Sequence, residues 1–185
     1  MRNSLKSVLR GSGNATFVLL LINCLFMQSR VGLTAEFEAS KEFRQYCGSC
    51  HGNTGDGQGV AARYLYPKPR DLLNGKIRLA TSSNMIASGD DIKAVLINGV
   101  PNTSMPSWKQ LSAGLIDRLV TEVQQIQVLG AQQRVSAVLK EDGLLVDSDG
   151  NLNSEGQQEV TDYTTQHTVP TAAWISPPIL RSSAT

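Results

Sequence analysis

The clearest pattern of apolar and polar positions lies in residues 113–127. Apolar side chains recur there three or four residues apart, which places them on one face of a helix. Ser112 precedes this stretch and belongs to a residue type that favours the N-cap of a helix. The pattern predicts an amphipathic helix over about 113–127, and its apolar face consists of Leu115, Leu119, Val123 and Ile126.

Two shorter helices are predicted before this one. Residues 38–48 carry Phe43 and Tyr46 and begin with an acidic side chain, which suits the positive end of a helix dipole. Residues 90–98 begin with two acidic residues and end before Gly99, a residue type that is common just after a helix. The pattern therefore predicts three helices between residues 38 and 127.

The N-terminus has the pattern of an export signal. Three basic side chains lie within the first ten residues, and an apolar stretch follows from Ala15 to Met27. We predict that residues 1–35 are a secretory signal peptide, cleaved after Ala35, and that the mature protein is periplasmic or otherwise exported. The alternative is an uncleaved segment that associates the protein with a membrane. No apolar run reaches the roughly 20 residues that a spanning helix needs.

Composition and charge narrow the range of functions. The chain has 185 residues, and aromatic residues make up only 5% of them, so its core is expected to be small or completed by a cofactor. The formal net charge is +1, but residues 1–35 hold four of the 17 basic residues and none of the acidic ones. The remaining chain is therefore acidic overall. This argues against nucleic-acid binding, which calls for a clustered basic face.

Two cysteines remain after the predicted signal peptide, in Cys47-Gly48-Ser49-Cys50-His51. Two thiols at this spacing can bond to the two vinyl groups of a haem, and the adjacent histidine can bind its iron, which is the attachment pattern of c-type haem. A thioredoxin-like redox site needs alternating strands and helices, which this region lacks. A zinc site needs four ligands, and the chain offers only His167 as a further soft one. The sequence favours haem.

Four separated motifs in this order resemble class I bacterial cytochromes c, over about residues 38–127. The resemblance implies an all-α cytochrome c fold with three or four short helices around one covalently attached haem c, and electron transfer as the activity. It implies an electron carrier, not an enzyme, with redox proteins as partners. The alternative is a haem subunit that relays electrons in a larger oxidoreductase complex. The motifs are Cys47–His51, Gly55–Gly59, Pro67–Asp71 and Asn98–Pro106.

His51 is the expected proximal ligand of the haem iron. Its other ring nitrogen is expected to donate to a backbone carbonyl in the loop 59–69, which would fix the ring. The second axial ligand is a choice among Met105, Met85 and His167. Met105 is favoured because its loop carries a proline on each side, which stiffens it. Met85 is assigned to core filling, and His167 lies in a polar tail.

Two further expectations concern contacts inside the fold. Arg70 and Trp108 are expected to hydrogen-bond a haem propionate, the alternative being a surface arginine and a half-buried tryptophan. In the resembled family a glycine of the first helix meets an aromatic residue of the last one. This chain has Ala39 and Glu122 at those positions, so Phe43 is expected to supply the contact by packing on the last helix.

The C-terminal part of the chain differs in composition. Residues 36–129 are expected to form the cytochrome c domain, and 130–185 a poorly structured extension that serves as a linker or docking tail. Its few apolar residues bury too little surface to offset the entropy lost on ordering it. Within it, 131–140 could extend the last helix, 144–152 could form a small hairpin, and 174–180 could contact a partner. The extension is expected to be dispensable for the haem site.

Overall fold

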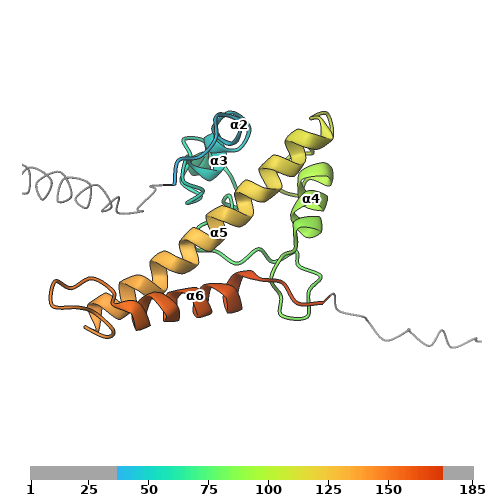
Figure 1. Cartoon of the computed structure of the whole chain (residues 1–185). Helices are drawn as coiled ribbons and strands as arrows, with labels where there is room; N and C mark the ends of the chain where they lie inside the picture. The colour runs from blue at the N-terminus through green and yellow to red at the C-terminus, as the bar shows by residue number, and fades with distance from the viewer. Residues whose placement is uncertain (1–36, 173–185) are drawn as a thin grey trace, which may run out of the picture. The chain divides into compact units, whose positions relative to one another are not determined.

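The computed structural model describes residues 37–172, in which all named elements are helices. The all-α class predicted from the sequence is confirmed. The predicted signal peptide and the segment 174–180 lie outside the described residues. In chain order the elements are α2 (Lys41–Tyr46), α3 (Gly48–His51), the 3-10 helix η2 (Ala62–Tyr64), α4 (Gly89–Asn98), α5 (Ala113–Glu141) and α6 (Ser154–Thr168) (Figure 1).

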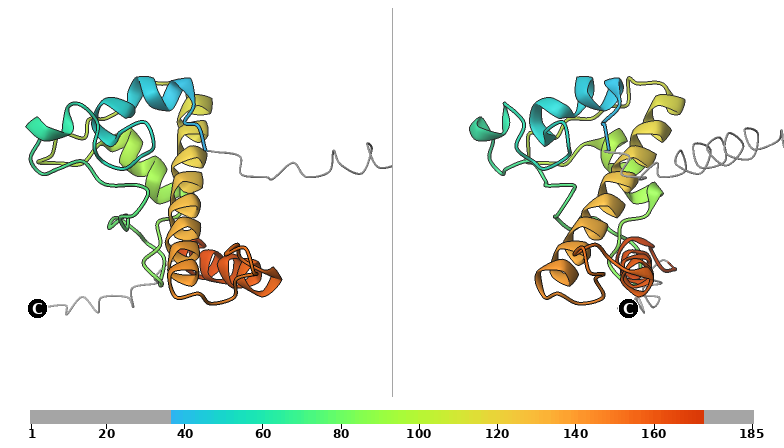
Figure 2. Two further views of the ribbon diagram at one scale, coloured as in Figure 1. Left: turned by 90° about the vertical axis from the view of Figure 1, so that its left-hand side faces the viewer. Right: turned by 60° about the vertical axis from the view of Figure 1, so that its left-hand side comes forward.

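The long helix α5 is the element against which α2, α4 and α6 pack, whereas α3 contacts α2 and η2. α2 and α4 contact its first part, and α6 lies along its last part (Figure 2). The apolar core forms where the first part of α5 meets α2 and α4. Its members include Phe43, Ile92, Leu96, Ile116, Leu119, Val123 and Ile126.

The first predicted helix, over 38–48, is shorter in the structure and split in two. Ser40 is the N-cap of α2, and its hydroxyl accepts a hydrogen bond of 2.9 Å from the backbone N–H of Phe43. Cys47 has a φ of −115° and separates α2 from α3. Phe43 itself is completely buried, in the core that also contains Leu119 and Val123. It therefore packs as expected.

A polar contact joins α2 to α5 where the resembled family has a glycine and an aromatic residue. Ser40 donates its backbone N–H to one carboxylate oxygen of Glu122 and its hydroxyl to the other, each at 2.6 Å. The Glu122 residue is only 8% exposed. Because a buried carboxylate needs hydrogen-bond partners, Ser40 and Glu122 stabilise each other's burial.

The second helix agrees with its predicted range. Ser88 and Asp91 form a capping box at the start of α4, in which each side chain accepts a hydrogen bond from the backbone N–H of the other residue. Burial raises the pKa of the Asp91 carboxyl, but the hydrogen bonds from Ser88 and Thr81 outweigh this effect. The pKa of Asp91 therefore lies below its ordinary value, and the ionised carboxylate stabilises the helix start.

The third helix extends well beyond the predicted end at residue 127. α5 has 29 residues, and its apolar face continues past Gly130 through Ala131, Val135 and Leu139, which are all buried. These residues are four positions apart, so they lie on one face of the helix. The predicted boundary at 129/130 falls inside this continuous helix, and the division into two domains stays a prediction.

No helix of the described residues is long and apolar enough to cross a membrane.

The extension differs from the poorly structured tail that its composition predicts. α6 packs on α5, and Gly156 and Thr164 of α6 are buried. The small hairpin forms, with an antiparallel bridge between Val146 and Leu152. The prediction from composition considered only the apolar residues of the tail itself and left out its contacts with α5. In the structure, α5 supplies the apolar surface against which the tail orders.

The extension is also attached to two loops of the preceding part. The Arg134 guanidinium donates a hydrogen bond of 2.9 Å to the carbonyl oxygen of Leu73. After α6, the backbone carbonyl of Ala172 accepts a 3.0 Å hydrogen bond from the N–H of Ser83. Thr171 and Val169 add further hydrogen bonds to Ser83 and Asn84. Residues 130–172 therefore contact the chain at two places between η2 and α4, at Leu73 and at Ser83–Asn84.

Candidate functional site

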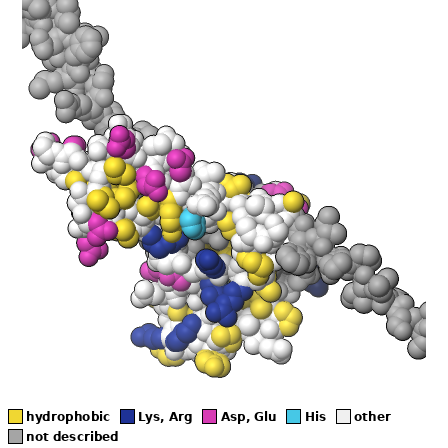
Figure 3. Space-filling model, turned by 90° about the horizontal axis from the view of Figure 1, so that it is seen from below, with side chains coloured by type: hydrophobic (Ala, Val, Ile, Leu, Met, Phe, Trp, Pro, Cys, Tyr) yellow, Lys and Arg dark blue, Asp and Glu magenta, His cyan; other side chains and the backbone are white. Residues whose placement is uncertain are grey.

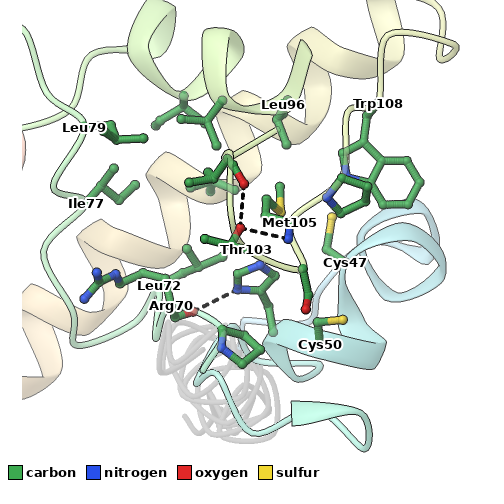
Figure 4. Close-up of a pocket in the computed structure, with 18 of the residues that line it drawn as sticks. Cys47, Cys50, Arg70, Leu72, Ile77, Leu79, Leu96, Thr103, Met105 and Trp108 are labelled. Atoms are coloured by element: carbon green, nitrogen blue, oxygen red, sulfur yellow. Dashed lines mark hydrogen bonds between the residues drawn. The ribbon is translucent and has the colours of Figure 1, made fainter. Parts of the chain in front are cut away.

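Cys47, Cys50, His51 and Met105 line one cavity of about 370 Å³. In the view of Figure 4, the two cysteines lie on one side of this cavity, Ile77 lies on the other side, and Met105 lies between them. The structure thus brings together two thiols and an imidazole from the region of α2 and α3 with a thioether from the loop before α5. The rest of the lining is mainly apolar and includes Leu65, Leu72, Leu79, Leu96, Val100 and Val123.

The two cysteines are unbonded to each other in the structure. Cys47 is buried and Cys50 half-buried. Burial, with smaller contributions from the negative charges of Glu122 and Cys50, raises the pKa of the Cys47 thiol to about 12. Redox-active Cys-x-x-Cys sites need a lowered thiol pKa, because the thiolate is the reactive form. The environment of Cys47 therefore weighs against a thioredoxin-like site.

His51 is held by a backbone carbonyl. Its Nδ1 lies 2.8 Å from the carbonyl oxygen of Arg70. A carbonyl only accepts, so Nδ1 carries the proton and Nε2 is left with a free lone pair. Burial lowers the pKa of His51, and the Arg70 carbonyl opposes this effect without cancelling it. A neutral imidazole with a free Nε2 is the form that binds a metal.

The position of that carbonyl corrects one expectation. The sequence placed the acceptor for His51 in the loop 59–69, whereas the structure uses Arg70, the next residue. Gly57 and the 70–71 backbone pass close to each other, since a Cβ at Gly57 would lie 3.0 Å from the N–H nitrogen of Asp71. This close approach brings the Arg70 carbonyl, not an earlier one, to the imidazole.

Met105 lies in a loop that its own hydrogen bonds stiffen. The Thr103 hydroxyl donates to the carbonyl of Val100 at 2.8 Å and accepts from the N–H of Met105 at 3.1 Å, and both bonds are drawn in Figure 4. The N–H of Val100 in turn donates to the carbonyl of Met105 at 3.1 Å. Gly99 has a φ of +69°, and a side chain there would press on the backbone of Met105. The loop is therefore fixed at both of its ends.

The two other candidate axial ligands lie elsewhere. Met85 is 60% exposed and is not part of the cavity lining, so it fills no core either. It follows Asn84 in the loop that residues 169–172 contact. His167 lies on α6, stacked on the ring of Tyr163 at 3.9 Å between ring centroids, and its Nδ1 lies 2.8 Å from the Tyr163 carbonyl. Among the described candidates, Met105 alone reaches the cavity of His51.

Arg70 and Trp108 both line the cavity. The backbone of Arg70 orients His51, while its side chain is exposed. Trp108 is half-buried, meets the Tyr46 ring edge-on at 5.7 Å between centroids, and donates its backbone N–H to the Leu96 carbonyl at 2.8 Å. Their contact with a haem propionate stays a prediction.

Sequence reasoning missed four polar residues of the lining, Lys68, Arg78, Thr103 and Ser104. Lys68, Thr103 and Ser104 stand inside the motifs that carry the family resemblance, so their place in the sequence pointed to the site. Arg78 lies in a segment without a motif or an apolar period, and nothing in the sequence alone indicated that it reaches the cavity.

The residues of the cavity fit a haem of the c type. Two thiols at the attachment spacing, one imidazole with a free nitrogen, and one thioether share a cavity whose remaining surface is mainly apolar. This donor set matches the His/Met ligation that cytochromes c use. Among residues 37–172 no zinc site is assembled, because His167 lies outside the cavity that contains the two cysteines and His51.

Among the comparisons with known proteins, the match to a family model agrees with this fit. Residues 38–121, somewhat less than half of the chain, match the family model described as cytochrome c oxidase, cbb3-type, subunit III. The search of curated proteins found no match. Among solved structures, the chain is similar to a chain of the reducing HAO-like protein complex of Kuenenia stuttgartiensis, with 29% sequence identity and a TM-score of 0.41. That similarity covers 48% of this chain and 43% of the other one.

The family match and the cavity together support a c-type cytochrome that transfers electrons through haem. The matched residues 38–121 contain α2, α3, α4 and the first part of α5, and with them all four residues of the predicted donor set.

Proposed function

We propose that the chain is a monohaem c-type cytochrome of the bacterial envelope that carries electrons between redox proteins. One observation supports this most strongly: Cys47, Cys50, His51 and Met105 line the same mainly apolar cavity. Haem bound there would supply a one-electron couple, because its iron alternates between Fe(III) and Fe(II). Location in the envelope rests on the predicted signal peptide.

Each of the four residues has a separate part in holding the haem. Cys47 and Cys50 would bind it covalently through thioether bonds, and His51 and Met105 would be the axial ligands of its iron. The Arg70 carbonyl fixes the tautomer and the orientation of His51 before any ligand binds. The hydrogen bonds of Thr103 hold the loop of Met105, so binding of a weak thioether ligand loses less entropy than it would in a mobile loop.

We propose a carrier and not an enzyme because His51 and Met105 would both bind the haem iron. This ligation would leave no site for a substrate on the iron. With haem bound, the mainly apolar lining would limit the access of water to the iron, which favours the oxidation state of lower charge.

A second candidate function is a haem subunit that relays electrons inside an oxidoreductase complex. The matching family model supports it, because its description names a subunit of an oxidase. Purification from the native host decides between the two functions. A stable co-purifying partner supports the subunit, and a single species supports the separate carrier.

Covalent attachment is tested by extraction of the protein, expressed together with a cytochrome c maturation system. Acidified acetone should leave the haem on the denatured wild-type chain, and Cys47→Ser or Cys50→Ser should sharply reduce the amount of haem protein. Ser49→Ala, inside the same motif, is the control and should retain the haem. Complete loss of haem from the wild-type chain in acidified acetone would exclude thioether attachment.

A further inference from the structure

One short segment of the described chain, residues 37–172, is strongly basic, although that part of the chain is acidic overall. Residues 60–80 contain five basic residues and a single acid, Asp71. The rest of the described chain, 37–59 and 81–172, contains seven basic and 14 acidic residues. The positive charge is therefore concentrated in 21 residues. The five basic residues are Arg63, Lys68, Arg70, Lys76 and Arg78.

The charges of this segment face solvent and are not neutralised. All five basic residues are exposed. The ion pairs found in residues 37–172 are Arg44–Glu38 and Lys93–Asp117, and neither involves the segment. The carboxylate of Asp71 accepts hydrogen bonds from the backbone N–H groups two and three residues further on. Figure 3 shows Lys and Arg side chains gathered on one face among hydrophobic ones, with many of the acidic side chains grouped in another part of the view.

The basic residues form one rim beside the proposed haem site. Lys68, Arg70 and Arg78 line the cavity itself. The Lys68 ammonium donates to the carbonyl of Arg63 at 3.2 Å, which places Arg63 next to it. The Arg70 side chain approaches Gly75, which precedes Lys76. The two propionates of a haem would cancel at most two of the five charges, so the rim stays positive when the site is filled.

Exposed aromatic and apolar side chains lie in the same segment. Tyr64 is 76% exposed, Tyr66 93%, and Val60 78%. The Arg63 guanidinium lies over the Tyr64 ring, 4.8 Å from its centroid. Tyr and Arg are the residue types enriched at protein–protein contacts, where they carry much of the binding energy. A small anion gains nothing from exposed apolar surface, whereas a protein partner can bury it.

We propose that residues 60–80, hereafter the basic rim, are the docking surface for a redox protein whose own contact surface is acidic. The proposal rests on the proposed function, since docking at this rim brings the partner next to the haem cavity. Opposite charges would speed the encounter and orient the partner, and the exposed tyrosines would supply apolar contact. An electron would then pass between the partner's cofactor and the haem iron, one being oxidised as the other is reduced.

A plant-type ferredoxin, a small acidic redox protein, is a suitable probe. Its binding to the full chain is measured by calorimetry, which does not require electron transfer. Arg63→Glu/Lys76→Glu changes two rim residues that do not line the cavity. Arg118→Glu/Lys140→Glu is the matched control, because it makes the same change in net charge at exposed positions on α5.

The rim variant should bind ferredoxin at least about tenfold more weakly than the wild type at low salt, and the control less than about twofold more weakly. The difference should vanish at about 1 M salt, where charges are screened within a few ångströms. Equal effects of the two variants, or no effect of the rim variant, would overturn the proposal.

Two further measurements distinguish a protein-docking rim from a membrane-binding one and from a misfolded variant. Tyr66→Ser removes an exposed ring and should also weaken ferredoxin binding, so it tests the rim if the charge variant fails to fold. Binding of the wild type to phosphatidylserine vesicles, lost in the rim variant while ferredoxin binding is unchanged, would assign the rim to a membrane and overturn the proposal. Absence of the visible haem spectrum would instead refute the proposed function, while the calorimetry would still test the rim.

Discussion

The contact between Ser40 and Glu122 makes a quantitative prediction about stability. The carboxylate of Glu122 accepts two hydrogen bonds of 2.6 Å from Ser40 and is 8% exposed. A hydrogen bond to a charged group contributes about 1.5–3 kcal/mol. Glu122→Gln keeps one acceptor oxygen and loses the charge, so it should lower the free energy of unfolding by about 1–2 kcal/mol. Glu122→Leu removes both acceptors, and the gain from burying leucine offsets only part of the loss, so about 3 kcal/mol is expected.

Ser40 contributes a second interaction that enters the same calculation. Its hydroxyl also accepts from the N–H of Phe43 and so caps α2, which is typically worth about 1 kcal/mol. Ser40→Ala should therefore cost about 2–3 kcal/mol in total. The two single changes should not add, because each removes part of the same contact. We expect a coupling free energy of about 1–2 kcal/mol in the double variant.

The assay is urea unfolding of the haem-loaded protein at neutral pH, followed by circular dichroism. A shift of the midpoint at constant slope measures the change in stability. Glu159→Gln, at an exposed position on α6, is the matched control and should stay within about 0.5 kcal/mol of the wild type. Additive losses from Ser40→Ala and Glu122→Gln, or an unchanged midpoint in Glu122→Leu, would refute the reasoning.

Two other predictions concern α5 and α4. A Cβ at Gly130 would collide with the carbonyl oxygen of Leu73, so Gly130→Ala should lower the free energy of unfolding in urea by about 1–3 kcal/mol. At Gly114 the Cβ would meet open space, so Gly114→Ala is the control and should leave the stability unchanged or slightly raised. Equal midpoints for these two variants would contradict the tight contact at Leu73. Because the folded-state pKa of Asp91 lies below its ordinary value of 3.8, its contribution is complete above that pH and is lost as the pH falls through the folded pKa. Asp91→Asn should therefore be less stable than the wild type at neutral pH and lose less stability on acidification, and parallel pH profiles of the urea midpoint would contradict this.

The sequence predicted the parts of the fold that depend on local patterns. The stripe from Leu115 to Ile126 predicted the first part of α5, and the acidic start and Gly99 bounded α4 nearly at its observed ends. The Cys-x-x-Cys-His motif named three of the cavity residues, because this spacing is the known attachment pattern of c-type haem. Met105 was favoured because its loop carries a proline on each side, whereas the assignment of Met85 to core filling is wrong, since Met85 is 60% exposed.

The features that the sequence did not predict depend on contacts between distant residues. The extension orders because Ala131, Val135 and Leu139 continue the face of α5, and because Arg134 reaches Leu73 across 61 positions. No local sequence pattern predicts a contact between residues so far apart in the chain. Likewise, the acceptor for His51 is Arg70 because two backbone segments pass close to each other, and Glu122 is tolerated inside because Ser40 lies opposite.

The central claim is that His51 and Met105 are the axial ligands of one haem, and the far-red absorption of the oxidised protein tests it most directly. A sulfur–iron bond gives a weak band in that region. The account predicts the band in the wild type and in Met85→Ala, and its loss in Met105→Ala together with carbon monoxide binding to the reduced iron. Persistence of the band in Met105→Ala, with its loss in Met85→Ala, would contradict the account.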